Sequence, residues 1–331
     1  MDAVLPIVKN KNKLLISVFC LTLLFLTACS SGINTTPQQD SRTNKNESVK
    51  QVGEAKIGAY IVGAVWDHDI LYDLEDSIGH EFNIIQWFTS WPTVFEADRV
   101  NAIIKLGRMP LITWQSKNQS LDDIIAGKYD DYLRSWATGV KSVYGDVYLR
   151  PFPEMNGDWV PWNGEPKKLI KAWKHIVNTF HDEGVTNVKW VWSPNITDEP
   201  RIASNRMERY YPGKDYVDVF GLSGYNWGTV RDYTAWKSFS ETFAEPYERI
   251  SALGTQPIWL AEIASTEQGG DKAEWIKDML SSTSFPQIDA IIWFNEDKET
   301  DWRIESSVAS TNAFKEWFMQ AQLRRTLGFV P

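Results

Sequence analysis

The chain has 331 residues, with 34 lysines and arginines against 43 aspartates and glutamates, and its formal net charge is −9. Nucleic acids and anionic membrane surfaces are bound through basic patches, so this charge argues against both as partners and favours a neutral ligand. The two cysteines and four scattered histidines form no short-spaced metal-binding pair, and we expect neither a metal nor a cofactor.

The first 28 residues have the pattern of a signal peptide. Three lysines precede an apolar run from Leu14 to Leu26, which is too short to span a bilayer as a mature helix. The run ends in Leu26-Thr27-Ala28-Cys29, which resembles a bacterial lipobox, where cleavage before the cysteine exposes it for lipidation. We therefore expect a lipid anchor on Cys29, with the folded domain held at the cell envelope outside the cytoplasm, at the outer membrane if the cell is Gram-negative. The alternative is an ordinary signal peptide with an incidental cysteine.

Residues 29–55 are rich in Ser, Asn, Thr, Gln and Lys, and this composition predicts a flexible tether because it offers little apolar surface to bury. The other cysteine, Cys20, lies in the apolar run and would be removed with it. No thiol then remains for a disulfide or for catalysis. Residues 56–331 have the length of one large domain, and we expect it to be a monomer.

Within this domain, short runs of β-branched and aromatic residues alternate with amphipathic stretches. Eight runs predict strands, in chain order 57–61, 83–88, 110–114, 146–151, 188–193, 217–222, 257–262 and 289–294. Helices are predicted between them, among others over 97–106, 129–144, 166–183 and 271–281. Eight such units predict a single (β/α)8 barrel of the α/β class. An open doubly wound sheet would usually carry a glycine-rich loop after its first strand, and residues 57–65 contain none.

The chemistry of such barrels lies at the C-terminal ends of the strands. The residues expected there are Trp87, Trp114, Glu154, Trp192, Asn195, Tyr225, Glu262 and Trp293. An indole face can stack on the apolar face of a sugar ring, and the chain has 17 tryptophans. Two carboxylates among aromatic rings therefore indicate a carbohydrate site, although packing at the rim would explain any single tryptophan equally well.

The stretch with the most information about function is Arg150-Pro151-Phe152-Pro153-Glu154-Met155-Asn156-Gly157-Asp158-Trp159-Val160-Pro161-Trp162. It resembles the acid/base motif of glycoside hydrolase family 26, which is known for endo-β-1,4-mannanases and has relatives that cut mixed-linkage β-glucan or β-xylan. Residues 256–262 resemble the nucleophile strand of the family, and residues 189–195 and 221–226 resemble its fifth and sixth strand ends. The resemblance extends from about residue 57 to residue 320.

The resemblance implies that Glu154 is the acid/base, that Glu262 is the nucleophile and that Tyr225 orients the nucleophile through a hydrogen bond. It also implies that Trp293 forms the platform under the sugar at the cleavage site. Further substrate-binding candidates are Trp114, Trp159, Trp162, Trp192 and Asn195, and Arg150 is either a clamp on the carboxylates or an ion pair of the barrel core.

Two carboxyls roughly 5 to 5.5 Å apart are typical of a retaining double displacement, in which one is protonated and the other ionised. We expect the apolar rings of Trp159 and Trp162 and the neighbouring negative charge to raise the pKa of Glu154. A hydrogen bond from Tyr225 would keep Glu262 ionised.

One position departs from the family pattern, because Pro153 stands where the family has histidine immediately before the acid/base. The resemblance implies that this histidine lies beside the cleavage subsite of mannanases, so its absence bears on specificity for mannan. A proline also removes a backbone donor there. The leading interpretation is an endo-β-1,4-mannanase acting on a polysaccharide. The alternatives are a mixed-linkage β-1,3-1,4-glucanase, a hydrolase of an exopolysaccharide made by the same cell, and a carbohydrate-binding lipoprotein that has lost catalysis.

Overall fold

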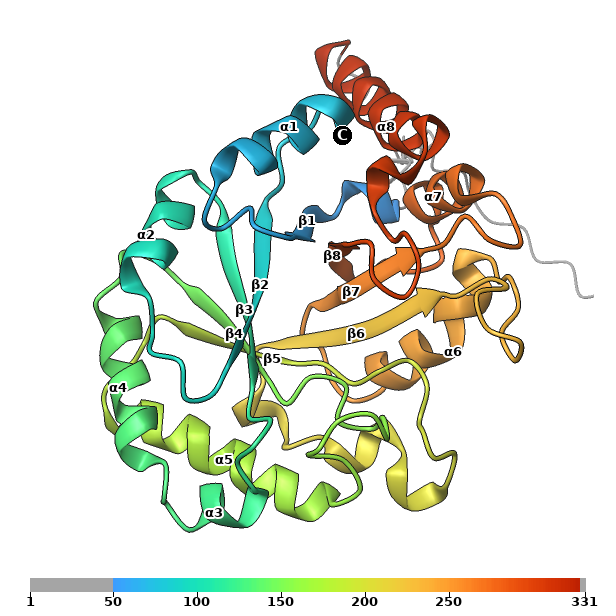
Figure 1. Cartoon of the computed structure of the whole chain (residues 1–331). Coiled ribbons are helices and arrows are strands. Elements are labelled where there is room, and N and C mark those ends of the chain that lie inside the picture. The colour runs from blue at the N-terminus through green and yellow to red at the C-terminus, as the bar shows by residue number, and fades with distance from the viewer. Residues whose placement is uncertain (1–49, 328–331) are drawn as a thin grey trace, which may run out of the picture. The chain divides into compact units, whose positions relative to one another are not determined.

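A computed structural model describes residues 50–327 as a closed barrel of eight parallel strands (Figure 1). The strands pair in sequence order and β8 closes on β1. They are β1 (Lys56–Ile61), β2 (Ile84–Ser90), β3 (Met109–Gln115), β4 (Val147–Pro151), β5 (Val188–Trp192), β6 (Val219–Asn226), β7 (Ile258–Ser265) and β8 (Ile288–Asn295). All eight predicted strands and the (β/α)8 barrel are confirmed, and β6 and β7 continue beyond their predicted ends to Asn226 and Ser265.

The helices surround the barrel and cover the outer side of the strands (Figure 1). They are α1 (His68–Ile78), α2 (Ala97–Lys105), α3 (Leu121–Ile125), α4 (Asp130–Lys141), α5 (Pro166–Asp182), α6 (Phe239–Ser251), α7 (Lys272–Ser281) and α8 (Val308–Thr326). Short 3-10 turns lie at Val52–Glu54, Ala203–Asn205, Met207–Tyr210, Lys214–Tyr216 and Ile304–Ser306. The predicted start of α7 is confirmed, because the Asp271 side chain accepts a hydrogen bond from the backbone N–H of Glu274. Within residues 50–327, no helix combines the length and the apolar character needed to cross a bilayer.

Side chains alternate between the barrel interior and the helices, as the strand period of two requires. A separate buried cluster fills the interior, and it consists of Ile84, Leu111, Val191, Val219, Trp259, Ala290 and Ile292. The intervening residues, such as Ile112 and Leu149, pack with the helices in the larger core. This alternation decides which side chains near the strand ends can reach the mouth of the barrel.

The folded domain begins earlier than predicted. Residues 50–55 were expected in the tether, but Val52 is only 1% exposed and its N–H donates to the carbonyl of Ser282 at 2.8 Å. Lys50 Nζ also donates to the carbonyl of Ile288 at 2.8 Å. The buried side chain of Val52 and these two hydrogen bonds attach the segment to the barrel. The rest of the predicted tether, the signal peptide and Cys29 lie outside the described residues.

Candidate active site

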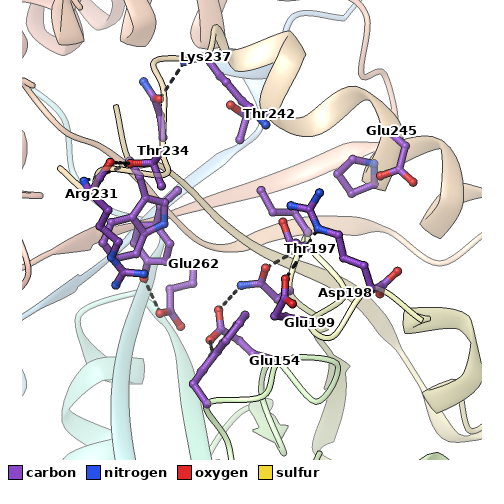
Figure 2. A pocket seen from close by; sticks show the side chains of 18 of the residues that line it. Glu154, Thr197, Asp198, Glu199, Arg231, Thr234, Lys237, Thr242, Glu245 and Glu262 are labelled. Carbon is purple, nitrogen blue, oxygen red and sulfur yellow. Dashed lines mark hydrogen bonds and ion pairs between the residues drawn. The ribbon is translucent and has the colours of Figure 1, made fainter. Parts of the chain in front are cut away.

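A cavity of about 1220 Å³ opens at the C-terminal ends of the strands, on the side of β4 to β8. Glu154 and Glu262 both line it, together with segments that follow β5, β6 and β8 and with residues of α6 between Glu241 and Arg249. Figure 2 shows the two carboxyl groups facing the open space, with Arg231 and Thr234 on one side and Asp198, Glu199 and Glu245 on the other. The structure therefore brings the two predicted glutamates into one cavity.

The backbone after β4 directs Glu154 into this cavity. Phe152 and Glu154 have positive φ angles of 48° and 56°, in the left-handed region that residues other than glycine rarely occupy. Such conformations persist only where the surroundings hold them, and they cluster at functional sites. The holding contacts here include a hydrogen bond of 2.8 Å from the Glu154 N–H to the carbonyl of Ser193 and one of 3.0 Å from Trp162 Nε1 to the carbonyl of Pro153.

Both carboxyl oxygens of Glu154 accept hydrogen bonds. Asn195 Nδ2 donates to Oε1 at 2.9 Å, and Trp159 Nε1 donates to Oε2 at 2.7 Å. Burial raises the pKa of Glu154, and the negative charge of Glu262 raises it further. The shift has the expected direction, and burial is its largest cause. Trp159 adds an opposing effect that the sequence does not show. Its indole N–H stabilises the carboxylate and so lowers the pKa.

A bulge in β7 turns Glu262 toward the mouth of the barrel. Leu222 of β6 pairs with Leu260, but the next residue of β6, Ser223, pairs with Glu262, so that Ala261 is an extra residue in the ladder. Trp259 faces the interior, and without the bulge the side chain of Glu262 would point to the outer side. The extra residue reverses the alternation and brings Glu262 inward.

Two donors hold the carboxylate of Glu262. Arg150 Nη1 lies 2.5 Å from Oε2, and the hydroxyl of Tyr225 donates to Oε1 at 2.5 Å. Arg150 is fully buried and also donates to the hydroxyls of Thr113 and Ser223. Burial and the adjacent Glu262 keep the pKa of the Tyr225 hydroxyl well above its ordinary value, so the phenol retains the proton that it donates. Arg150 thus makes an ion pair in the barrel with one of the two carboxylates.

Asn156 connects the segments that carry Glu154 and Asn195. Its Oδ1 accepts from the Asn195 N–H at 2.7 Å, and its Nδ2 donates to the Asn195 carbonyl and to Asp198 Oδ1, each at 2.9 Å. Asp198 is in turn paired with Arg249 of α6 at 2.7 Å. Asn156 was part of the recognised motif, but its partners lie on another strand end, and the sequence contains no signal for that contact.

Four tryptophans predicted to bind substrate are not part of the cavity wall. One is Trp162, which is 3% exposed and packs against Phe152 in the core. The other three, Trp114, Trp192 and Trp293, are at most 1% exposed and pack with the outer core. Their indole N–H groups donate to the Tyr132 hydroxyl and to the carbonyls of Tyr210 and Trp302, respectively. These three predictions are wrong because the residues occupy the outward positions of their strands. The same holds for Trp87, which was expected at the end of its strand and also packs with the outer core.

Other aromatic residues line the cavity instead of these tryptophans. Phe294 follows Trp293 and has the inward position, and it lines the cavity together with Trp227 and Trp302. The ring of Trp302 lies 5.0 Å from that of Tyr225 and 4.9 Å from that of Trp227. Strict alternation along β8 would have identified Phe294. Trp302 lies in the following loop, where no periodic pattern applies.

Replacing Arg150 by methionine is expected to lower the free energy of unfolding by about 3–5 kcal/mol, because it leaves Glu262 buried without its cation. The double variant with Glu262→Leu should recover part of this loss, since it removes the unpaired carboxylate as well. Urea denaturation of the wild type, both single variants and the double variant measures the coupling. Equal stability of Arg150→Met and the wild type would contradict the ion pair.

Comparison with known proteins shows which family the sequence of this chain is similar to. Residues 112–252 match the sequence model of glycosyl hydrolase family 26. The chain is 36% identical over 273 residues to endoglucanase H of Acetivibrio thermocellus, an alignment that covers 79% of this chain and 30% of that protein. It is 28% identical over 153 residues to the mannan endo-1,4-beta-mannosidase A and B of Caldalkalibacillus mannanilyticus, covering 42% of this chain and 26% of the relative. The matched regions therefore span less than a third of these relatives.

The fold is also similar to solved structures. The catalytic domain of the endo-beta-1,4-mannanase of Bacillus sp. JAMB-750 superimposes with a TM-score of 0.61 at 16% identity, over 81% of this chain and 86% of that one. At this identity the similarity supports the barrel fold alone.

Proposed function

Residues 112–252 of the chain belong to glycosyl hydrolase family 26, and on that premise we propose that the protein is a retaining, endo-acting hydrolase of β-linked polysaccharides. The observation that carries the proposal is the pair Glu154 and Glu262, which share one cavity but have different surroundings. Burial favours the protonated form of Glu154, whereas Arg150 and Tyr225 both donate to the carboxylate of Glu262. This division supplies one acid and one nucleophile.

In the first step, the protonated Glu154 gives its proton to the glycosidic oxygen while Glu262 attacks the anomeric carbon. The carbon–oxygen bond to the leaving sugar breaks, and an ester bond to Glu262 forms. In the second step, the ionised Glu154 takes a proton from a water molecule, whose oxygen attacks the anomeric carbon and releases Glu262. The two carboxyl groups and one water molecule supply the atoms and protons of both steps. Asn195 and Trp159, which donate to the two oxygens of Glu154, position it for both steps.

Trp159→Phe is expected to move the alkaline limb of the pH profile to higher pH. Activity requires protonated Glu154, so kcat/KM falls as the pH rises through the pKa of that group. The Trp159 N–H lowers this pKa, and phenylalanine removes the donor but keeps an aromatic ring. The measurement is kcat/KM against pH on a soluble polysaccharide for both proteins. A limb that stays in place or moves to lower pH would show that the hydrogen bond does not act on the catalytic proton.

The leading substrate is β-1,4-mannan, and the mannosidases among the relatives support it. Mixed-linkage β-glucan is the second candidate, favoured by Pro153 and by the longer match to an endoglucanase. Incubation of the purified protein with mannan, mixed-linkage β-glucan and xylan, with separation of the released oligosaccharides, distinguishes the two. Products from mannan alone support the mannanase, and products chiefly from the glucan make Pro153 a marker of glucan specificity. Binding without release from any of them would support a carbohydrate-binding protein instead.

We also propose that the protein is a lipoprotein of the cell envelope that acts as a monomer and contacts the membrane only through its anchor. The lipobox-like sequence ending in Cys29 supports the anchor, with residues 1–28 removed as a signal peptide. Such an enzyme would act on polysaccharide outside the cytoplasm, either supplied from the surroundings or made by the cell itself. Mass spectrometry of the mature N-terminus tests this, because lipidation requires an acylated Cys29 as the first residue.

A further inference from the structure

Trp66 is unusual among the tryptophans of this chain. All 17 lie within residues 50–327, and in this part of the chain only Trp66 and Trp159 are exposed, with 65% and 51% of their surface in solvent. Trp159 has a place in the site, since it donates to Glu154. Trp66 contributes to neither the cavity wall nor the buried core. An exposed apolar side chain is common in itself, so the position of Trp66 decides whether it has a role.

Trp66 lies at the same end of the barrel as the glutamates, in the loop that joins the C-terminal end of β1 to α1. In a closed barrel of eight strands, β1 and β2 are opposite β5 and β6. The helices that follow them lie on opposite sides in Figure 1, α1 and α2 across from α5 and α6. The far wall of the cavity is built after β5 and β6. A sugar chain that enters there and crosses between the glutamates therefore leaves over the loops after β1 and β2.

An aromatic floor connects the catalytic pair to this exit. Phe294 lines the cavity, and its ring stacks on Tyr60 of β1 at 5.0 Å. Tyr60 in turn meets Phe88 of β2 edge to face at 4.8 Å. Burial, together with the charges of Glu296 and Glu262, raises the pKa of Tyr60 to about 12, which agrees with a phenol that faces the catalytic centre. The rings of Tyr60 and Phe88, near the C-terminal ends of β1 and β2, thus continue the aromatic floor toward the β1–α1 loop.

Trp66 is held in place before any ligand arrives. The guanidinium of Arg99 on α2 lies 4.6 Å from the indole centroid, and Arg99 is fixed by an ion pair with Glu96. The backbone N–H of Trp66 donates to the carbonyl of Gly63 at 2.9 Å. A ring ordered on one side by a cation and open to solvent elsewhere loses little side-chain entropy on binding. Such pre-ordering distinguishes a platform from a freely rotating surface side chain.

We propose that Trp66 is a distal subsite, on which the indole stacks against a pyranose unit of the β-linked chain beyond the units held at Glu154 and Glu262. This inference rests on the proposed function, because it takes the polysaccharide as the ligand. The exposed side chains of Val62 and Ile70 in and after the same loop add apolar surface beside the platform. The subsite binds long chains and is not reached by the shortest oligosaccharides that the protein cleaves.

The test compares Trp66→Ala and Trp66→Phe with the wild type on the cleaved polysaccharide and on the shortest oligosaccharide that is cleaved. We expect Trp66→Ala to lower kcat/KM on the polymer about tenfold, mainly through KM, and to leave the short substrate unchanged. Trp66→Phe should retain most of the activity on the polymer. Tyr144→Ala is the matched control, because Tyr144 is 90% exposed but precedes β4 at the other end of the barrel, and it should match the wild type on both substrates. The ratio of kcat/KM on the polymer to kcat/KM on the short substrate should therefore fall in Trp66→Ala. A ratio equal to that of the wild type would overturn the subsite.

A second readout separates failure of the subsite from failure of the proposed function. If the wild type releases no sugar from any glycan, the proposed hydrolase is wrong, and the same proteins are run on native gels that contain mannan or mixed-linkage β-glucan. Retardation of the wild type that is reduced in Trp66→Ala and kept in Tyr144→Ala supports the platform. Retardation that is absent, or equal in all three proteins, overturns it.

Discussion

Glu262→Ala is expected to lower kcat/KM on the polysaccharide by about 10⁴-fold or more, because it removes the group that attacks the anomeric carbon. The loss should be the same for substrates with good and poor leaving groups, since bond formation to Glu262 is part of the first step in both. Glu316→Ala is the matched control, because Glu316 is an exposed glutamate on α8 and should keep wild-type activity.

The product formed with azide identifies the role of Glu262. Alanine leaves space on the face of the sugar that the carboxylate occupied, and azide can attack there in a single displacement. The expected product is a glycosyl azide of inverted, α configuration, which proton NMR distinguishes from the β form. A β-glycosyl azide, or activity within tenfold of the wild type, would contradict the assignment of Glu262 as nucleophile.

Glu154→Ala is expected to lower kcat/KM on the polysaccharide by about 10²–10⁴-fold, the usual contribution of a general acid. A sugar leaving group needs the proton of Glu154, whereas a dinitrophenolate does not. The first step on a dinitrophenyl β-glycoside should therefore proceed at close to the wild-type rate, followed by slow hydrolysis of the ester on Glu262. A burst of dinitrophenolate in stopped-flow absorbance measures this.

Azide should accelerate the second step of Glu154→Ala and give a β-glycosyl azide, because it attacks the ester from the face where Glu154 normally activates water. The two alanine variants thus predict azide products of opposite configuration. Equal losses on activated and natural substrates, without a burst, would show that Glu154 is not the proton donor.

The eight strands were predictable because each is a short apolar run between amphipathic helices. The two glutamates were predictable because they lie in distinctive motifs directly after such runs. The inward or outward direction of each side chain was harder, because neighbouring residues of a strand point to opposite faces and an error of one residue selects the wrong side chain. Trp293 and Phe294 illustrate this, since the neighbour of the predicted platform faces the cavity.

Other features depend on contacts between distant segments, which one sequence does not display. The bulge at Ala261 turns Glu262 inward through the pairing of β6 with β7. Asn156 ties Glu154 to the end of β5, and the chain bears no periodic pattern for that contact. Trp66 is one of 17 tryptophans in the sequence, and only the structure of residues 50–327 shows that it is exposed while most of the others are packed.

The measurement that tests the two-glutamate mechanism most directly is proton NMR of the sugar anomers released in the first minutes of hydrolysis. A retaining double displacement through Glu262 predicts that the new reducing ends appear first as the β anomer and reach the α/β equilibrium later by mutarotation. New reducing ends that appear first as the α anomer would mean a single displacement by water, and Glu262 would then not be the nucleophile.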